Sequence, residues 1–145
     1  MDDRRLVELA FEAREHAYAP YSHWTVGTAL LCADGSIYQG CNIENAAYSP
    51  SHCAERTAFV RALYDGKRDF EAIAVVGGPE GGDAPDFCAP CGVCRQVMME
   101  FCDPATFRIV MGRTGAEPKV ALFGELFPEG FGPANLGKAT PGGTV

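Results

Sequence analysis

The sequence predicts a single three-layer α/β/α domain in which helices cover both faces of a mixed, five-stranded sheet. Three observations support this prediction. The chain of 145 residues is long enough for one domain with a substantial core. Helical and strand-like patterns alternate along it, which implies crossover connections between strands. Residues 71–78 form an almost continuous apolar run of strand length, which is typical of a central strand covered on both faces.

The N-terminal part of the chain contains one predicted helix and one predicted hairpin. Apolar side chains recur at steps of three and four over residues 3–17, which predicts an amphipathic helix that Pro20 breaks. Two strand patterns follow within residues 25–40, and Asp34-Gly35 between them is a strong two-residue hairpin signal. We therefore expect a strand pair directly after the first helix.

The rest of the chain supplies two further helices and three strands, after a polar loop at 41–51. These elements are a helix at 53–64, a strand at 71–78, a helix at 91–101 and strands at 107–112 and 119–123. We assign residues 1–136 to one domain and expect the tail at 137–145 to be disordered.

Composition and charge favour a small substrate. Hydrophobic residues make up 47% and charged residues 21% of the chain, as in ordinary globular proteins. The formal net charge of −7 argues against nucleic-acid binding, which usually requires a basic face. No apolar run approaches the roughly 18 residues of a membrane span, and the N-terminus lacks a signal-peptide pattern. We therefore expect a cytoplasmic protein without a membrane partner.

The seven cysteines need an explanation, because an odd number does not suit a complete disulfide framework and cytoplasmic thiols stay reduced. Cys91 and Cys94 form a C-x-x-C at a predicted helix start, and Cys53 begins the preceding helix. Helix N-termini favour thiolates, and in α/β sheets they converge at the carboxyl ends of the strands. We therefore expect the three sulfur atoms to meet.

Three convergent thiolates would select zinc, a soft tetrahedral ion. Three protein ligands leave the fourth position to water, which is typical of a catalytic site. Glu55, two residues after Cys53, is placed to take that water's proton. Since three thiolates outweigh the charge of Zn²⁺, we expect Arg56 and Arg95 to hydrogen-bond the sulfurs and offset the excess.

The cysteine pattern by itself leaves two other classes open, a thiol redox protein and a structural zinc protein. A redox site would not need Cys53 and Glu55, and a structural site would want a fourth protein ligand. His52 adjoins Cys53, but neighbouring residues rarely both point into one tetrahedral site, so we expect it to stay outside. The remaining cysteines are expected to be small packing residues: Cys32, Cys41, Cys88 and Cys102.

Three motifs carry a resemblance to a known family: CNIENAAY at 41–48, CAERTA at 53–58 and PCGVCRQ at 90–96. With these motifs in this order, nearly the whole chain resembles cytidine deaminases of the small, homotetrameric, three-cysteine type. The resemblance implies one Zn²⁺ per chain on Cys53, Cys91 and Cys94, with Glu55 as the proton shuttle. It further implies hydrolytic deamination of cytidine and 2′-deoxycytidine to uridine and 2′-deoxyuridine, with release of ammonia, in pyrimidine salvage.

The resemblance also assigns residues to the substrate. Asn42 and Glu44 would hydrogen-bond the ribose 3′-hydroxyl, since an amide and a carboxylate can together donate and accept. Trp24 stands where the family is expected to have Phe against the base. The other expected contacts are the backbone of Ala54, Tyr48 beside the sugar, and Phe131 from a neighbouring subunit. From the residues alone, Trp24 could equally pack in the core and Asn42 could hold its own loop.

Within the same fold, the nearest alternative is a deaminase of a modified pyrimidine nucleoside such as blasticidin S. The intact NIEN sequence at 42–45 favours an ordinary nucleoside. Editing of a polynucleotide is disfavoured by the acidic charge of the chain.

Overall fold

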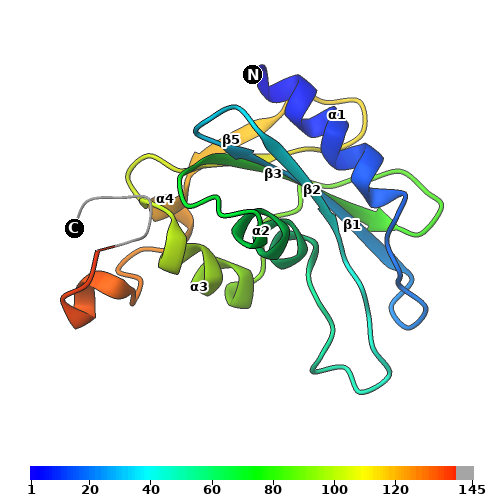
Figure 1. The fold of residues 1–145 in the computed structure, drawn as a ribbon. Coiled ribbons are helices and arrows are strands. Elements are labelled where there is room, and N and C mark those ends of the chain that lie inside the picture. The colour runs from blue at the N-terminus through cyan, green and yellow to red at the C-terminus, as the bar shows by residue number, and fades with distance from the viewer. Residues whose placement is uncertain (140–145) are drawn as a thin grey trace.

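Five strands form one mixed sheet in the order β2-β1-β3-β4-β5 in the computed structural model, which describes residues 1–139 (Figure 1). They are β1 (Trp24–Cys32), β2 (Ile37–Cys41), β3 (Phe70–Pro79), β4 (Arg108–Met111) and β5 (Lys119–Leu122). Strands β3 and β4 run parallel, and the other neighbouring pairs are antiparallel. The prediction of a mixed, five-stranded sheet is confirmed.

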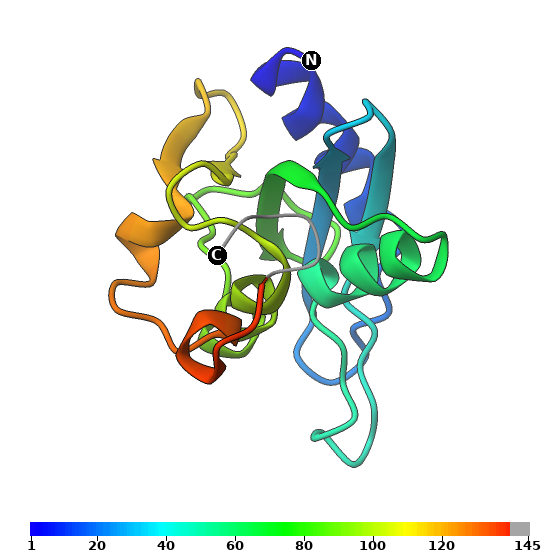
Figure 2. The same ribbon diagram turned by 60° about the vertical axis from the view of Figure 1, so that its left-hand side comes forward.

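Helices cover both faces of this sheet (Figures 1 and 2). Helix α1 (Asp3–Arg14) lies on one face, whereas α2 (Ala54–Tyr64) and α3 (Gly92–Phe101) lie on the other. Two short elements that were not predicted follow β5, namely α4 (Phe123–Leu126) and the 3-10 helix η1 (Pro133–Leu136). None of the helices in the described residues is long and apolar enough to span a membrane.

Two clusters of buried side chains hold the three layers together. On one face, Leu6 of α1 packs over the small side chains of β3. On the other face, Phe59 of α2 and Met98 of α3 belong to the same cluster as Ile73 and Val75 of β3. Successive strand residues point to opposite faces, so β3 is buried on both, as its apolar run predicts.

The topology places the N-termini of α2 and α3 at one edge of the sheet. Strands β2 and β3 both run antiparallel to β1, so their carboxyl ends point the same way. Helix α2 follows β2 and helix α3 follows β3, and both therefore begin near that edge. Cys53 and Cys91 are the N-cap residues of these two helices. The fold thus brings together motifs that lie 38 residues apart in the chain.

A glycine and a threonine seat α2 closely against the sheet. A Cβ atom on Gly40 would lie 2.4 Å from the carbonyl oxygen of Ala54 and 2.6 Å from the nitrogen of Ala58, so a side chain is excluded there. The buried hydroxyl of Thr28 donates to the Ala54 carbonyl oxygen at 3.0 Å. These contacts fix the first turn of α2, which carries the predicted chemistry.

The first helix is shorter than predicted, ending at Arg14 rather than near residue 17. Beyond Arg14 the chain turns away to pair with the loop at 41–51. The N–H of Tyr18 donates to the Asn42 carbonyl oxygen at 2.9 Å, and Tyr18 forms a parallel bridge with Ile43. This long-range pairing competes with continuation of the helix.

The C-terminal boundary of the domain stays a prediction. Gly137 adopts a left-handed conformation with φ 70°, and the N–H groups of Gly137 and Lys138 close η1 by donating to its carbonyl oxygens. Most of the tail for which we expected disorder, 137–145, lies outside the described residues.

Candidate active site

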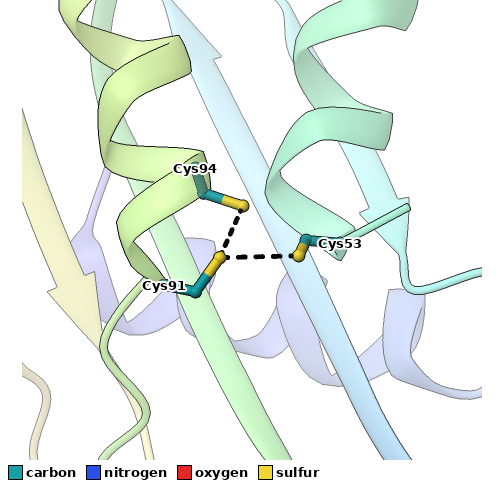
Figure 3. Close-up of side chains that lie close together, drawn as sticks. All are labelled: Cys53, Cys91 and Cys94. Atoms are coloured by element: carbon teal, nitrogen blue, oxygen red, sulfur yellow. Dashed lines mark hydrogen bonds between the residues drawn. The ribbon is translucent and has the colours of Figure 1, made fainter. Parts of the chain in front are cut away.

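The sulfur atoms of Cys53, Cys91 and Cys94 converge between the N-termini of α2 and α3 (Figure 3). The Sγ atom of Cys91 lies 3.6 Å from that of Cys53 and 3.4 Å from that of Cys94. All three sulfurs lie within 4.8 Å of one another, and within the described residues no fourth ligating side chain joins the group. His52 stays outside it, as expected. The predicted meeting of the three thiols is confirmed.

The surroundings of the cluster favour a thiolate on Cys53. The hydrogen bond to Cys94, helped by Arg56, lowers the pKa of Cys53 to about 5. The helix N-termini at Cys53 and Cys91 add positive potential. The hydrogen bond to Cys53 and burial raise the pKa of the Cys94 thiol. A bound cation would resolve this competition, because it accepts both sulfurs as thiolates.

This donor set fits zinc. Tetrahedral Zn–S bonds of about 2.3 Å place the sulfur atoms about 3.8 Å apart. The two sulfur separations of 3.4 and 3.6 Å are close to that value. Thiolates also select zinc over hard cations such as Mg²⁺. With three protein ligands, one coordination position stays free for chemistry.

A cavity of about 310 Å³ opens beside the cluster. One side of it, which we call the helix wall, consists of Cys53, Ala54, Glu55 and Cys91. Another part of the lining, which we call the loop wall, consists of Ser22, Trp24, Val26, Asn42 and Glu44. Two members of the sulfur cluster, Cys53 and Cys91, and most of the predicted substrate residues therefore line one cavity.

Glu55 is the buried acid of the helix wall. Its exposed fraction is 4%, and burial raises the pKa of its carboxyl group to about 7. A carboxyl group with a pKa near neutrality can both take up and return a proton at physiological pH. Cys53 is the N-cap residue of α2, and Glu55 lies in the first turn of the same helix. The carboxyl group is therefore close to the sulfur cluster.

The Asn42 side chain ties the loop to β1. Its Oδ1 atom accepts from the Val26 N–H at 2.8 Å, and its Nδ2 atom donates to the Trp24 carbonyl oxygen at 2.8 Å. This is the loop-holding role that the sequence left open. One lone pair on Oδ1 and one N–H on Nδ2 remain. Asn42 therefore still has a donor and an acceptor for a ligand in the cavity.

Glu44 is held in place by the segment that precedes β1. Its Oε1 atom accepts from the N–H groups of Tyr21 and Ser22, both at 3.1 Å, and its Oε2 atom accepts from the Ser22 hydroxyl. These bonds, the hydroxyl first, lower the pKa of Glu44. A carboxylate offers about four acceptor sites, so one site on Oε2 remains for a ligand.

The predicted aromatic contacts divide into one inside the cavity and two outside it. Trp24 is 42% exposed and lines the cavity, so it is not a core residue. Tyr48 is 72% exposed and lies in a neighbouring hollow, where its ring meets that of Tyr21 edge-on. Phe131 is 59% exposed, away from the cavity, and its carbonyl oxygen accepts from Gln96. The fully buried Ala54 lines the helix wall.

The two arginines behave differently. Nη2 of Arg56 lies 3.9 Å from the Cys53 sulfur and also donates to the Ser51 carbonyl oxygen, so its guanidinium group stands beside the cluster. Arg95 instead donates to the carbonyl oxygens of Pro90 and Leu126, at 2.7 and 2.6 Å. Arg95 thus links the segment before α3 to α4. We expected it to hydrogen-bond a sulfur atom instead, and that expectation was wrong.

Three residues that shape the site lie outside the three sequence motifs. Cys88, expected to be a packing residue, packs against the core and also lines the cavity, and burial raises its pKa to about 11. Its position three residues before Cys91 was the available signal. Thr28 and Gly40 seat α2, yet threonine and glycine in strands have no distinctive spacing.

Known proteins match this chain over most of its length. The family model described as "Cytidine and deoxycytidylate deaminase zinc-binding region" matches residues 1–111. A cytidine deaminase of Sporosarcina psychrophila is 45% identical over 139 residues, which cover 96% of this chain and 98% of that protein. One of Halalkalibacterium halodurans is 46% identical over 131 residues, which cover 90% and 95%.

Solved structures agree with the fold described above. The cytidine deaminase from Burkholderia pseudomallei is 47% identical and superposes with a TM-score of 0.81, covering 90% of this chain and 100% of its own. That from Mycobacterium tuberculosis is 32% identical, with a TM-score of 0.74 and coverage of 91% and 98%. The resemblance and the fold expected from it are confirmed. The chain belongs to the cytidine and deoxycytidylate deaminase family.

Proposed function

We propose that this chain catalyses the zinc-dependent hydrolysis of cytidine and 2′-deoxycytidine to uridine and 2′-deoxyuridine, with release of ammonia. The observation that carries the proposal is that two of three convergent thiols, a buried carboxyl group and a loop with unused hydrogen-bonding groups line one cavity, and the third thiol lies 3.4 Å from one of these two. Relatives named cytidine deaminase over nearly the whole chain support it. A redox protein would need neither the third thiol nor the acid, and a structural zinc site would want a fourth ligand.

Cys53, Cys91 and Cys94 would hold one zinc ion per chain. Zinc bound there supplies Lewis-acid activation of the attacking water. Arg56, at 3.9 Å from the Cys53 sulfur, offsets the negative charge of the three thiolates.

Glu55 moves the protons of the reaction. Its carboxylate takes a proton from the water that attacks C4 of the pyrimidine and delivers it to N3. A C4–O bond forms, and Glu55 then takes the remaining proton from the new C4 hydroxyl and passes it to the amino group. The C4–N bond breaks, the group leaves as ammonia, and C4 keeps the carbonyl oxygen. The pKa of about 7 makes both the uptake and the return of the proton feasible near neutrality.

The loop wall would bind the nucleoside. The free acceptor of Glu44 and the free donor and acceptor of Asn42 suit the 3′-hydroxyl, which both cytidine and 2′-deoxycytidine carry. Free cytosine lacks that hydroxyl and would leave these groups unpaired, so it is rejected. Trp24 and the backbone of Ala54 would contact the base, with Tyr48 towards the sugar.

The proposed protein is a cytoplasmic homotetramer. Phe131 would close the cavity of a neighbouring subunit in a homotetramer, which agrees with its exposure away from the cavity of its own chain. The seven cysteines are all unpaired, which agrees with a reducing, cytoplasmic setting. The proposed reaction, which returns uracil nucleosides, suits a role in pyrimidine salvage.

The test is ultraviolet-monitored turnover by the purified, zinc-loaded protein. We expect conversion of cytidine and 2′-deoxycytidine, and none of free cytosine, which serves as the control. A protein that holds about one zinc per chain and converts neither nucleoside would contradict the proposal. Blasticidin S would then be the next substrate to try, because Trp24 replaces the expected Phe in the loop wall.

A further inference from the structure

One glycine of β3 lies directly behind the cavity. Gly77 pairs with Val26 of β1, and Trp24 is the next residue on the same face of that strand. A Cβ atom on Gly77 would lie 3.1 Å from the Cys88 sulfur, 3.2 Å from Nε1 of Trp24 and 3.2 Å from Cγ2 of Val26. All three of these neighbours line the cavity. We call the position that a Cβ atom on Gly77 would occupy, and around which these three side chains pack, the Gly77 space.

The other glycines of these strands have a different role. Cβ atoms on Gly27, Gly40 and Gly78 would lie 2.0 to 2.4 Å from backbone atoms of a helix or loop, which cannot move aside locally. The nearest atoms to Gly77 all belong to side chains, and its φ angle is not positive. The backbone packing of the fold therefore does not require glycine at position 77. What glycine provides there is room for the three side chains.

Trp24 is the neighbour that would yield if the Gly77 space were filled. Its side chain is 42% exposed at the start of β1 and borders the open cavity. Val26 and Cys88 are packed against the core cluster and have less freedom. Diagonal neighbours on adjacent strands are within reach of an aromatic side chain. A methyl group at Gly77 would therefore displace the indole towards the cavity.

We propose that Gly77 is a positioning residue for nucleoside binding, because the side chain it lacks lets the Trp24 indole sit back beside Cys88 and keeps the cavity open for the base. The inference rests on the proposed function, since it concerns the affinity for the nucleoside. Gly77 acts through Trp24 and is not required to touch the substrate.

The first measurement needs no substrate, because Trp24 is the only tryptophan of the chain. Gly77→Ala is expected to shift its fluorescence emission to longer wavelength and to increase quenching by acrylamide, as the indole moves into the solvent-filled cavity. Gly82→Ala is the matched control, since a Cβ atom there meets its nearest atom at an ordinary 3.6 Å. That control should leave the emission unchanged.

The second measurement separates binding from chemistry. We expect Gly77→Ala to raise KM for cytidine about threefold and to keep kcat within roughly 1.5-fold, because a displacement of the indole by a few tenths of an ångström weakens binding and spares Glu55. Trp24→Phe removes the ring edge that carries Nε1. In the Trp24→Phe background, Gly77→Ala should therefore have little further effect on KM.

An unchanged emission spectrum and an unchanged KM in Gly77→Ala would overturn the inference, and so would an equal effect of Gly77→Ala in both backgrounds. If Gly77→Ala folds poorly, the double variant should be the more stable of the two, because the contact with the indole is removed, and equal stability of both would also overturn the inference. A wild-type protein that does not convert cytidine would defeat the proposed function instead. The emission comparison would then still decide whether Gly77 seats Trp24.

Discussion

The helix wall and the loop wall of the cavity differ in how exposed their largest functional side chains are within one chain. In the helix wall, Glu55 is 4% exposed, and the adjoining Cys94 is 1% exposed. In the loop wall, Trp24 at the start of β1 is 42% exposed, and Tyr48, beyond Glu44 in the loop at 41–51, is 72% exposed. The first group stands on two helix N-termini packed against the sheet, whereas the second depends on a strand start and a loop that extends away from the domain (Figure 1).

This difference separates two tasks. Bond-breaking chemistry needs a few groups at fixed separations, and helix N-caps beside a sheet edge provide them at short range. Holding a nucleoside needs a surface that closes around it, and large aromatic side chains provide that surface only when something packs against them. We therefore expect changes in the helix wall to abolish the reaction and changes in the loop wall to weaken binding.

The largest effect should come from removal of a thiol. Cys91→Ala is expected to lose bound zinc and to reduce turnover at least about 10⁴-fold, because water without a Lewis acid keeps a pKa far above 7. Cys91 is the exposed member of the cluster, so its replacement disturbs packing least. Zinc content by atomic absorption and cytidine turnover are the measurements. Cys41→Ala, away from the cluster, is the control, and a Cys91→Ala protein that keeps both zinc and activity would contradict the site.

Glu55→Gln should have the next largest effect. The amide keeps the shape of the side chain but cannot move protons, so we expect kcat to fall about 10³-fold, while zinc stays bound. The measurement is kcat at saturating cytidine together with zinc content. Glu100→Gln, exposed on α3, should match the wild type. Near-normal turnover by Glu55→Gln would remove this carboxyl group from the mechanism.

The helix wall was predictable from sequence because its geometry follows from topology. Strands that carry crossover helices on one face place the helix N-termini at one edge, so motifs at Cys53 and Cys91 had to approach each other. The alternation of apolar segments predicted the layers, and Asp34-Gly35 predicted the turn between β1 and β2. The connection itself, residues 33–36, is longer than the two residues expected. None of these predictions needed a side-chain contact between distant residues.

The parts that escaped prediction depend on such contacts. Arg95 binds the carbonyl oxygen of Leu126 in α4, a helix too short to leave a periodic pattern. Helix α1 stops early because Tyr18 pairs with the loop at 41–51. The importance of Gly77 depends on the register between β1 and β3, which a single sequence does not reveal.

Within the loop wall, Glu44→Gln tests the ribose contact. Loss of a charged hydrogen bond to the 3′-hydroxyl should lower kcat/KM for cytidine roughly 10- to 100-fold. Removing the hydroxyl by use of 3′-deoxycytidine should cost the wild type a similar factor and the variant much less. Glu80→Gln, whose carboxylate pairs with His23 outside the cavity, is the control. An equal penalty for the missing hydroxyl in wild type and variant would show that Glu44 does not bind it.

Phe131→Ala should have the smallest effect and bears on whether the loop wall is completed by another chain. We expect KM for cytidine to rise about fivefold with kcat preserved, because one apolar contact with the base is lost. Leu136→Ala, 66% exposed on the same segment, is the control.

The source of the Phe131 contact can be tested by mixing subunits. Glu55→Gln chains have an intact Phe131, and Phe131→Ala chains have an intact Glu55. If the phenylalanine acts across an interface, subunits of the two variants that reassemble together should form some sites with a KM near that of the wild type, and those sites should disappear when the chains are mixed without exchange. A mixture that shows only the KM of Phe131→Ala would mean that each chain closes its own loop wall. In that case, contact with a neighbouring subunit would not explain why these aromatic side chains are exposed.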